Sequence, residues 1–486
     1  METKEKRIRP FGIRDKLAYA AGDLGCNMSF SLKNTVQTFW LVYMALETGL
    51  LSILLLIVQI WDAVNDPMIG AMIDADRRQY KRGKFKTYIL IGAIGLLVGG
   101  AAVFLPFPNA SVVVKAILFI VGYIIWDAFY TIANVPYGSM LSLVTEDAGE
   151  RAQLSTWRSI GSMIGNILPG MILPALIWKK EFNADGTPMI NEETGVQVET
   201  LLGDRVFIAA LIMGVLGLAA FLFMIKTITI RVNENSVKTN DVEKFNVFKA
   251  FGNFMKNRPA VGATMAAMGM FLGMNAAGTA VTIMFATYFG MAQLSGVVQM
   301  IGFVPMFFFM PFIKKIVDKH GKKEASVAGT IVSLVGGVIM LIFPMVPKSA
   351  ALIVYMIGLT LFGMGMGVYT CVSWALMADA IDYSEWKFGK REEGTVYSLH
   401  SFFRKLAQGV GPSVVLFIMG LLGYVSDLGT GGQSAETVYN MCWLAGGLYM
   451  FSAIVQFIGL SVVYNLDKKT METMNAELAE RRKSAE

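Results

Sequence analysis

Two carboxylates, Asp62 and Asp66, stand one helical turn apart within an apolar stretch of this sequence. Asn65 lies three residues after Asp62, so a helix would bring three oxygen-bearing side chains onto one face. Two like charges at this spacing repel unless a cation lies between them or one carboxylate takes a proton. Because small hard cations prefer oxygen ligands, the pattern predicts a site for such a cation or for a transferable proton. The alternative is structural: the pair caps the helix at Pro67 or meets lysines at the membrane interface.

A second polar stripe lies in the stretch 112–144, where Asp127, Thr131 and Asn134 are spaced by four and three residues. A helix that places a carboxylate, a hydroxyl and an amide along a single face lines something polar. The alternative is a buried network that joins this helix to the one that carries Asp62, since polar residues also hold membrane helices together.

Positive charges inside apolar stretches mark a second kind of site. Arg158 and Lys405 come from opposite halves of the chain, and near the middle of a bilayer both would face a shared cavity. A charge there costs roughly 2.5–3.5 kcal/mol, so each one needs a partner or a function. We expect their acidic counterparts to be Asp23, Asp127 or Asp66.

Two further basic residues, Lys33 and Arg404, are less specific, because a long side chain can extend along its helix to the membrane surface. Several aromatic residues could stack on a sugar ring, although any one of them is more often part of the core or the interface. They are Trp126, Trp157, Trp374, Tyr130 and Tyr137.

The elements that must position these residues are membrane helices. The 486 residues are 55% hydrophobic and 16% charged, whereas soluble domains are about 25% charged. Apolar stretches of about 20 residues, enough to cross a bilayer, recur along the chain. They predict twelve spans, near 17–46, 51–74, 87–107, 112–144, 152–178, 204–226, 259–290, 294–313, 325–346, 350–380, 395–424 and 437–464.

The basic residues predict the orientation of these spans. Lys and Arg gather in alternate loops and in both tails, and cytoplasmic loops carry such an excess. The opposite loops hold only Lys115, Lys179, Lys180, Arg205 and Lys348. Both termini should therefore be cytoplasmic, in a multi-pass protein of the plasma (inner) membrane. The net charge of +6 then reflects topology and not affinity for nucleic acid.

A repeated loop predicts two halves. After the second span Asp74 precedes Arg77, Arg78 and Lys81-Arg82-Gly83-Lys84, and after the eighth comes Asp318-Lys319-His320-Gly321-Lys322-Lys323. Similar loops at matching places indicate duplicated six-helix bundles. We expect an N-terminal bundle at 1–226, a cytoplasmic linker at 227–257, a C-terminal bundle at 258–465 and a cytoplasmic tail at 466–486.

These loops resemble those of the major facilitator superfamily, and the resemblance covers the whole chain. Two longer motifs narrow it: Trp-Asp-Ala-Val-Asn-Asp-Pro at 61–67, and Ala-Asp-Ala-Ile-Asp-Tyr-Ser-Glu-Trp-Lys at 378–387 followed by Gly-Lys-Arg-Glu-Glu-Gly-Thr-Val-Tyr-Ser at 389–398. Together they resemble the glycoside-pentoside-hexuronide:cation symporters, the family of the melibiose permease. The resemblance implies an all-α membrane protein with twelve transmembrane helices in two pseudo-symmetric six-helix bundles, the major facilitator fold.

The resemblance also implies a function and roles for residues. Members of that family carry sugars or their conjugates inward with a sodium ion, a lithium ion or a proton. Their cation site falls on Asp62, Asn65, Asp66 and Thr131, with Asp62 and Asp66 as metal ligands only if the ion is sodium. Their sugar site falls on Asn27, Asn134, Arg158, Ser401 and Lys405. To these we add Asp127 as a cation-binding residue, and Asp23 and Tyr137 as substrate-binding residues.

Departures from the family pattern bear on the substrate and the ion. Asn27 and Asn134 stand where the melibiose permease has carboxylates, which leaves the cavity more positive and would suit a sugar acid. A neutral pentoside or glucoside is the rival substrate. Asp127 adds a third carboxylate beside Asp62 and Asp66, and the excess negative charge is relieved when one of them takes a proton. We therefore favour proton coupling over sodium coupling.

Other functions are disfavoured by what the sequence contains. Its two histidines, His320 and His400, belong to no nucleophile–base constellation, so we do not expect an enzyme. We expect no cofactor, and as partners a sugar or glycoside, a monovalent cation and the lipid bilayer, but no nucleic acid. Two alternatives to symport remain, a sugar uniporter and a non-transporting membrane sugar sensor.

Overall fold

The computed structural model describes residues 9–76, 78–145, 147–231, 247–302, 304–305, 312–389 and 393–485. The chain divides into two compact units, Met1–Lys179 with Thr200–Asp241, and Lys180–Glu199 with Val242–Glu486. The bundle boundaries expected at 226 and 258 stay a prediction. The clearest difference between these units and the expected bundles is the segment 180–199. It belongs to the second unit although it lies between helices of the first.

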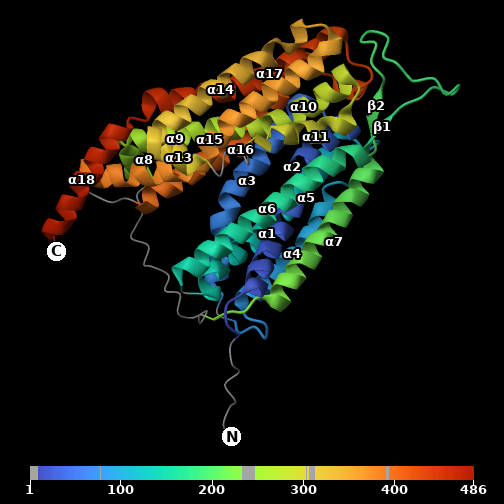
Figure 1. Cartoon of the computed structure of the whole chain (residues 1–486). Helices are drawn as coiled ribbons and strands as arrows, with labels where there is room; N and C mark the ends of the chain where they lie inside the picture. Colours follow the sequence, from blue (N-terminus) through green and yellow to red (C-terminus); the bar gives the residue numbers. More distant parts are fainter. Residues whose placement is uncertain are drawn as a thin grey trace. The chain divides into compact units, whose positions relative to one another are not determined.

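The first unit consists mainly of long helices (Figure 1). They are α1 (Ile13–Phe30), α2 (Lys33–Thr38), the π-helical turn η1 (Phe39–Tyr43), α3 (Thr48–Ala75), α4 (Lys84–Ala102), α5 (Val112–Val144), α6 (Ala148–Ile177) and α7 (Gly203–Thr227). The strands β1 (Trp178–Lys180) and β2 (Glu199–Leu201) form the base of a hairpin between α6 and α7.

The second unit is also helical, and α14 packs against both α15 and α17 (Figure 1). Its helices are α8 (Val247–Lys256), α9 (Arg258–Phe271), η3 (Leu272–Ala276), α10 (Ala277–Met284), η4 (Phe285–Phe289), η5 (Ala292–Leu294), α11 (Ser295–Ile301), α13 (Ile313–His320), α14 (Lys322–Ile342), η6 (Phe343–Met345), α15 (Lys348–Phe388), α16 (Glu393–Leu421), η7 (Ser426–Leu428), α17 (Ala435–Ile458), η8 (Gly459–Val463) and α18 (Lys468–Ala485).

Eight helices in the described part of the chain are long and apolar enough, by length and composition, to cross a membrane. They correspond to α4, α5, α6, α7, α14, α15, α16 and α17. Shorter apolar helices cover Thr48–Asp62, Ala277–Phe289 and Ala292–Ile301. The predicted span 294–313 includes residues 303 and 306–311, which lie outside the described residues. Large apolar side chains such as Val98, Val113 and Leu421 are exposed on these helices, as expected for surfaces that face lipid.

Local sequence explains where several helices begin. The carboxylate of Asp147 accepts a hydrogen bond from the backbone N–H of Glu150, which caps the first turn of α6. Asn257 caps α9 in the same way through the N–H of Ala260, and Pro259 occupies the first turn, where no N–H is needed. The side-chain amide of Asn257 also donates to the carbonyl of Ala380, which ties the start of α9 to α15.

Close helix packing depends on glycines. A Cβ atom on Gly161 of α6 would lie 2.0 Å from the carbonyl oxygen of Ala20 on α1. A Cβ on Gly365 of α15 would lie 2.0 Å from the carbonyl oxygen of Gly329 on α14. Small residues let membrane helices approach this closely, and the contact energy comes from backbone packing. Larger side chains at these positions would force the helices apart.

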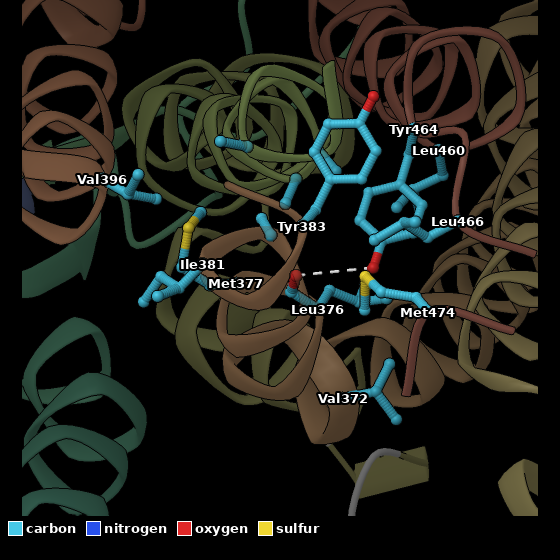
Figure 2. Close-up of a cluster of buried hydrophobic side chains, with 14 of the residues drawn as sticks. Val372, Leu376, Met377, Ile381, Tyr383, Val396, Leu460, Tyr464, Leu466 and Met474 are labelled. Atoms are coloured by element: carbon cyan, nitrogen blue, oxygen red, sulfur yellow. Dashed lines mark hydrogen bonds between the residues drawn. The ribbon is translucent and has the colours of Figure 1, made fainter. Parts of the chain in front are cut away.

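The predicted tail at 466–486 forms α18, which packs against α15. Figure 2 shows Leu376 and Met377 of α15 within one buried cluster that includes Leu466 and Met474 from the end of the chain. The hydroxyl of Tyr464 donates a hydrogen bond of 3.4 Å to the carbonyl of Leu376 (Figure 2). Apolar contacts therefore hold the tail against the second unit.

The hairpin between β1 and β2 has its contacts in the second unit. Its turns place Gly186 and Gly195 at positive φ, a conformation that glycine adopts without strain. The amide of Asn191 donates to the carbonyl of Gly431 at 2.7 Å, and the fully buried Glu199 accepts from the backbone N–H of Ala292. These bonds explain why 180–199 belongs to the second unit.

The buried carboxylate of Asp15 lies just before the predicted span 17–46. Asp15 of α1 is fully buried and lies 2.7 Å from both Arg9 and Arg231, and it accepts a hydrogen bond from the N–H of Thr229. Burial raises the pKa of Asp15, but the hydrogen bonds from Arg231 and Thr229 and the charge of Arg231 outweigh it, so the pKa lies below its ordinary value. This cluster joins the start of α1 to the chain that follows α7.

We expect Asp15→Asn to lower the free energy of unfolding by about 3 kcal/mol at pH 7, because it leaves two arginines without their anion. A carboxylate whose pKa falls on folding stabilises above its unfolded pKa of about 3.9, and that stability is lost as the pH falls through the folded pKa. The difference between wild type and variant should therefore shrink below about pH 4. Thermal unfolding in detergent measures it, with the exposed Glu472→Gln as control. If the stability difference between wild type and variant is the same at pH 7 as below about pH 4, Asp15 is not the ionised partner of the two arginines.

Candidate substrate and cation site

An ion pair joins α1 to α6 inside the first unit. The Nε of Arg158 lies 3.1 Å from a carboxylate oxygen of Asp23, whose side chain is only 7% exposed. Asp23 is one of the three carboxylates expected as possible partners for this arginine. The pair lies within an apolar bundle, where an unpaired buried charge is costly, so loss of either partner would destabilise the unit.

Amides extend this ion pair along α1 and α6. The side-chain amide of Asn27 donates to the second carboxylate oxygen of Asp23 at 3.0 Å. Asn166 of α6 in turn donates to the side-chain oxygen of Asn27 at 2.6 Å. Sequence analysis missed Asn166, although it lies eight residues after Arg158 and so falls on the same helix face. We refer to Asp23, Asn27, Arg158 and Asn166 as the α1–α6 polar network.

Tyr137 lies beneath this network. The guanidinium of Arg158 is 5.1 Å from the centre of the Tyr137 ring, which stacks on Tyr19 at 4.8 Å. The hydroxyl of Tyr137 donates to the carbonyl of Tyr19 at 2.8 Å. The fully buried ring of Tyr137 therefore packs against the guanidinium of Arg158. Asn134 lies one turn earlier on α5 and accepts a weak hydrogen bond from the thiol of Cys26, with sulfur and oxygen 3.7 Å apart.

A second group of oxygen atoms lies between α3 and α5. The amide nitrogen of Asn65 donates to Asp127 and to the hydroxyl of Thr131, both at 3.2 Å, and all three residues are buried. The carbonyl oxygen of the Asn65 side chain is buried and has no hydrogen-bond partner among the described residues. We call Asn65, Asp127 and Thr131 the α3–α5 oxygen cluster.

Of the two carboxylates that drew attention in the sequence, the structure describes the side chain of Asp62, which lies on the same helix as Asn65. Asp62 is half-buried on α3, one turn before Asn65, and both Asp62 and Asp127 lie within electrostatic range of the Tyr123 hydroxyl. Asp66 falls on α3, but its side chain lies outside the described residues. The described side chains contain no group of three or more His, Cys, Asp or Glu residues that could hold a metal ion.

The remaining predicted site residues lie in the second unit. Ser401 is half-buried and Lys405 is exposed, one turn apart on α16. Arg404, which sequence analysis allowed to extend to the membrane surface, instead lies over two aromatic rings from neighbouring helices.

Comparison with known proteins identifies the family. Residues 18–468 match the family model described as MFS/sugar transport protein. The chain belongs to this family. Its members are membrane transporters and not enzymes, so this protein is a multi-pass membrane transporter. The resemblance to the glycoside-pentoside-hexuronide symporters, drawn from the motifs at 61–67 and 378–398, is thereby confirmed.

Three curated relatives of this sugar-transport family cover nearly the whole chain. An uncharacterised symporter of Bacillus subtilis (strain 168) is 27% identical over 96% of this chain and 94% of its own. The isoprimeverose transporter of Lactiplantibacillus pentosus is 27% identical over 93% and 89%, and a glucuronide carrier protein homolog of Escherichia coli (strain K12) is 26% identical over 85% of each. Among solved structures, a D-xylose-proton symporter matches with a TM-score of 0.56 at 16% identity, over 91% of this chain and 96% of that one, which supports the fold alone.

The family motif at 378–398 contacts the repeated loop within the second unit. Asp379 of α15 pairs with Lys322 at the start of α14, with nitrogen and oxygen 2.6 Å apart. Lys322 follows Gly321, whose φ of +98° sharpens the turn between α13 and α14. This ion pair therefore links the turn between α13 and α14 to α15, through a residue of the motif shared with the symporter family.

Proposed function

We propose that this protein is a secondary active transporter that carries a sugar or glycoside together with a cation, by alternating access. In this proposal twelve transmembrane helices form two six-helix bundles in the plasma (inner) membrane, with both termini in the cytoplasm. The coupling ion is a proton or sodium, and no cofactor takes part. The two bundles expose the bound substrate to one side of the membrane and then to the other.

The α1–α6 polar network is the main observation that supports this proposal. Charged and amide groups at the core of an apolar bundle are expensive, and in membrane proteins they mark substrate pathways. Asp23, Asn27, Arg158 and Asn166 offer donors and acceptors at hydrogen-bond spacing to one another. Sugar hydroxyls, which both donate and accept, are ligands that such a set can bind. Ser401 and Lys405 are the proposed contribution of the second bundle.

The α3–α5 oxygen cluster is the proposed coupling site, together with Asp62 and Asp66. The side-chain carbonyl of Asn65 is a buried acceptor without a hydrogen-bond donor in the described part of the chain, and buried acceptors of this kind call for a cation or a donor. Asp127 contributes a carboxylate within 3.2 Å of the Asn65 amide. Several carboxylates around one monovalent ion favour a proton over sodium, because protonation removes the excess charge.

Uptake measurements separate the two ions. We expect that adding substrate to de-energised cells that express the protein will drive proton entry, seen as alkalinisation of the medium. Replacing external sodium by choline at fixed pH should leave the uptake rate unchanged within about twofold. Cells with the empty vector are the control. Strong stimulation of uptake by sodium at fixed pH would contradict proton coupling and leave sodium symport.

The same uptake assay distinguishes the rival functions. A uniporter would equilibrate its substrate but not concentrate it, with or without an ion gradient. A sensor would bind sugar without moving it, so vesicles with purified protein would show binding and no flux. Of these three functions, only symport links accumulation of the sugar to the gradient of an ion.

A further inference from the structure

A β-hairpin, residues 178–201, joins α6 to α7 and takes no part in the proposed sugar and cation sites. Its strands follow α6 and precede α7 with almost no intervening chain, since α6 ends at Ile177 and α7 begins at Gly203. The N–H of Leu202 donates to the carbonyl of Ile177 at 2.8 Å, which closes the base of the hairpin. The ends of α6 and α7 must therefore move together with this base.

The second unit binds the hairpin through hydrogen bonds from two separate segments. The amide of Asn191 donates to the carbonyl oxygens of Gly431 at 2.7 Å and of Gln433 at 3.2 Å, in the loop between α16 and α17. The ammonium of Lys348, at the start of α15, donates to the carbonyl of Thr194 at 3.4 Å. These bonds hold the hairpin away from its own helices and against the second unit.

Close packing adds to these hydrogen bonds. A Cβ atom on Gly290, the residue after η4, would lie 2.9 Å from Cγ1 of Val196. A Cβ atom on Gly431 would lie 2.6 Å from Cγ1 of Val198. Contacts this short leave no room for a larger residue at either glycine. The hairpin therefore fits the surface of the second unit closely, and Val196 is buried there.

Glu199 of β2 is fully buried where the hairpin meets the second unit. One of its carboxylate oxygens accepts from the N–H of Ala292, and its backbone carbonyl accepts from the hydroxyl of Thr430. The other carboxylate oxygen is buried and has no hydrogen-bond partner among the described residues. Lys180 on the neighbouring β1 is the charged group that acts on Glu199, whereas η5 and the loop after α16 contribute the uncharged Ala292 and Thr430. A buried ion with an unsatisfied oxygen is costly, so a neutral carboxyl fits this place better than a carboxylate.

The pKa of Glu199 reflects its position. Burial raises the pKa, and the hydrogen bond from Ala292 and the charge of Lys180 offset only part of the rise. In a released hairpin the carboxyl would face water, where a glutamate has a pKa of about 4.3. Docking is therefore strongest below about pH 4.3, where both forms hold the proton, and it weakens as the pH rises through the higher pKa of the docked form.

From these contacts we infer that the hairpin 178–201 is a pH-sensitive latch, which docks on the second unit while Glu199 is protonated and is released when Glu199 gives its proton to the solvent. Docking ties the ends of α6 and α7 to the second unit through the base of the hairpin. Alternating access requires the two bundles to move relative to each other, so a docked latch slows transport in an acidic medium. The effect on transport rests on the proposed function, whereas the docking itself does not.

Spin labels measure docking within the second unit. Glu192→Cys in the hairpin and Asp427→Cys in the loop that binds it provide exposed labelling positions, and Cys371→Ser removes a half-buried native thiol. Asn191→Ala, which lacks two docking bonds, brings the released form into measurable range.

Pulsed EPR on the full chain in lipid nanodiscs gives the ratio of docked to released hairpin. We expect this ratio to fall at least about threefold between pH 5 and pH 8, because each unit by which docking raises a pKa changes the ratio by up to about tenfold. A ratio that stays constant, or that rises with pH, would overturn the inference.

Two matched glutamate variants assign the response to Glu199. Glu199→Gln mimics the protonated acid, so its ratio of docked to released hairpin should stay high at both pH values. Glu193 of the same hairpin also accepts a backbone N–H of the second unit, from Ala435 at 3.1 Å, but it is exposed. Glu193→Gln should therefore keep the pH response. If Glu199→Gln keeps it as well, another group controls docking and the inference is rejected.

Exchange of labelled for unlabelled sugar tests the effect of the latch on transport. At pH 8, where only the wild type is released, Glu199→Gln should exchange sugar at least about threefold more slowly than the wild type. At pH 5, where both are docked, the two rates should agree. Comparing each variant with the wild type at the same pH removes the pH dependence of proton coupling itself. Glu193→Gln should match the wild type at both pH values.

The outcomes separate the latch from the proposed function. If docking responds to pH but Glu199→Gln exchanges sugar at the wild-type rate at pH 8, the hairpin does not control transport and the latch is rejected. If docking responds but the wild type moves neither glycosides, pentosides nor hexuronides at either pH, the proposed sugar transport fails and the pH-sensitive docking stands.

Discussion

The Asp62→Asn variant is expected to equilibrate its substrate across the membrane but not to concentrate it. Asp62 is half-buried on α3, one turn before Asn65 of the α3–α5 oxygen cluster. The charges of Asp62 and Asp127 both act on Tyr123. Asparagine keeps the size of the side chain but can neither take up a proton nor balance a cation at neutral pH. The carrier then has no charge at this position that the coupling ion must neutralise before the bundles move.

The predicted effect of Asp62→Asn is large because coupling is lost and transport is retained. The accumulation ratio should fall to about one, whereas exchange of labelled for unlabelled substrate should change by less than about threefold, within the range of a small local perturbation. Concentrative uptake and exchange in the same vesicles measure the two quantities. Asp204→Asn is the matched control, since Asp204 is an exposed acid at the start of α7. A variant that still concentrates substrate would place the coupling site elsewhere.

The Arg158→Gln variant is expected to lose both substrate binding and stability. It removes the cation that lies 3.1 Å from Asp23 and above the ring of Tyr137. Asp23 would remain buried without its partner, which destabilises a protein by several kcal/mol when both partners are dry. The side chain of Arg158 is 39% exposed, so we expect a loss of about 2 kcal/mol in the free energy of unfolding.

A double variant separates the structural and functional parts of this loss. Adding Asp23→Asn to Arg158→Gln removes the unpaired buried charge, so the free energy of unfolding should recover most of its loss. Substrate binding should remain at least tenfold weaker, because the charged donors and acceptors are gone. Thermal unfolding in detergent and ligand titration measure the two properties, with the exposed Arg205→Gln as control. Recovery of binding in the double variant would show that the pair serves only to hold α1 against α6.

Much of the helical architecture was predictable from local sequence. The apolar stretches at 87–107 and 437–464 correspond to α4 and to α17 with η8 within a few residues. Hydrophobic length is a local property, because a span must cover the bilayer with its own residues. The family motifs are also local, since each occupies one continuous segment.

Partners between helices were less predictable. Sequence analysis placed Asn65, Asp127 and Thr131 in one cation group, and the structure brings these three together. It left three candidates for the acid beside Arg158, because the rotation of each helix about its axis is not encoded in spacing along one helix. It omitted Asn166, whose contact with Asn27 depends on the approach of α6 to α1.

Local sequence patterns were sufficient to predict a membrane transporter, the helices that carry its polar residues, and the residue types that could bind a cation and a sugar. Hydropathy and motif spacing are sufficient for those conclusions because they act within single segments. Packing between helices was needed to show that Arg158 pairs with Asp23, that 180–199 belongs to the second unit, and that Arg404 lies over Trp374 and Phe271. These outcomes depend on packing between segments far apart in the chain, where a long side chain has several partners within reach and the energy of the whole bundle selects one.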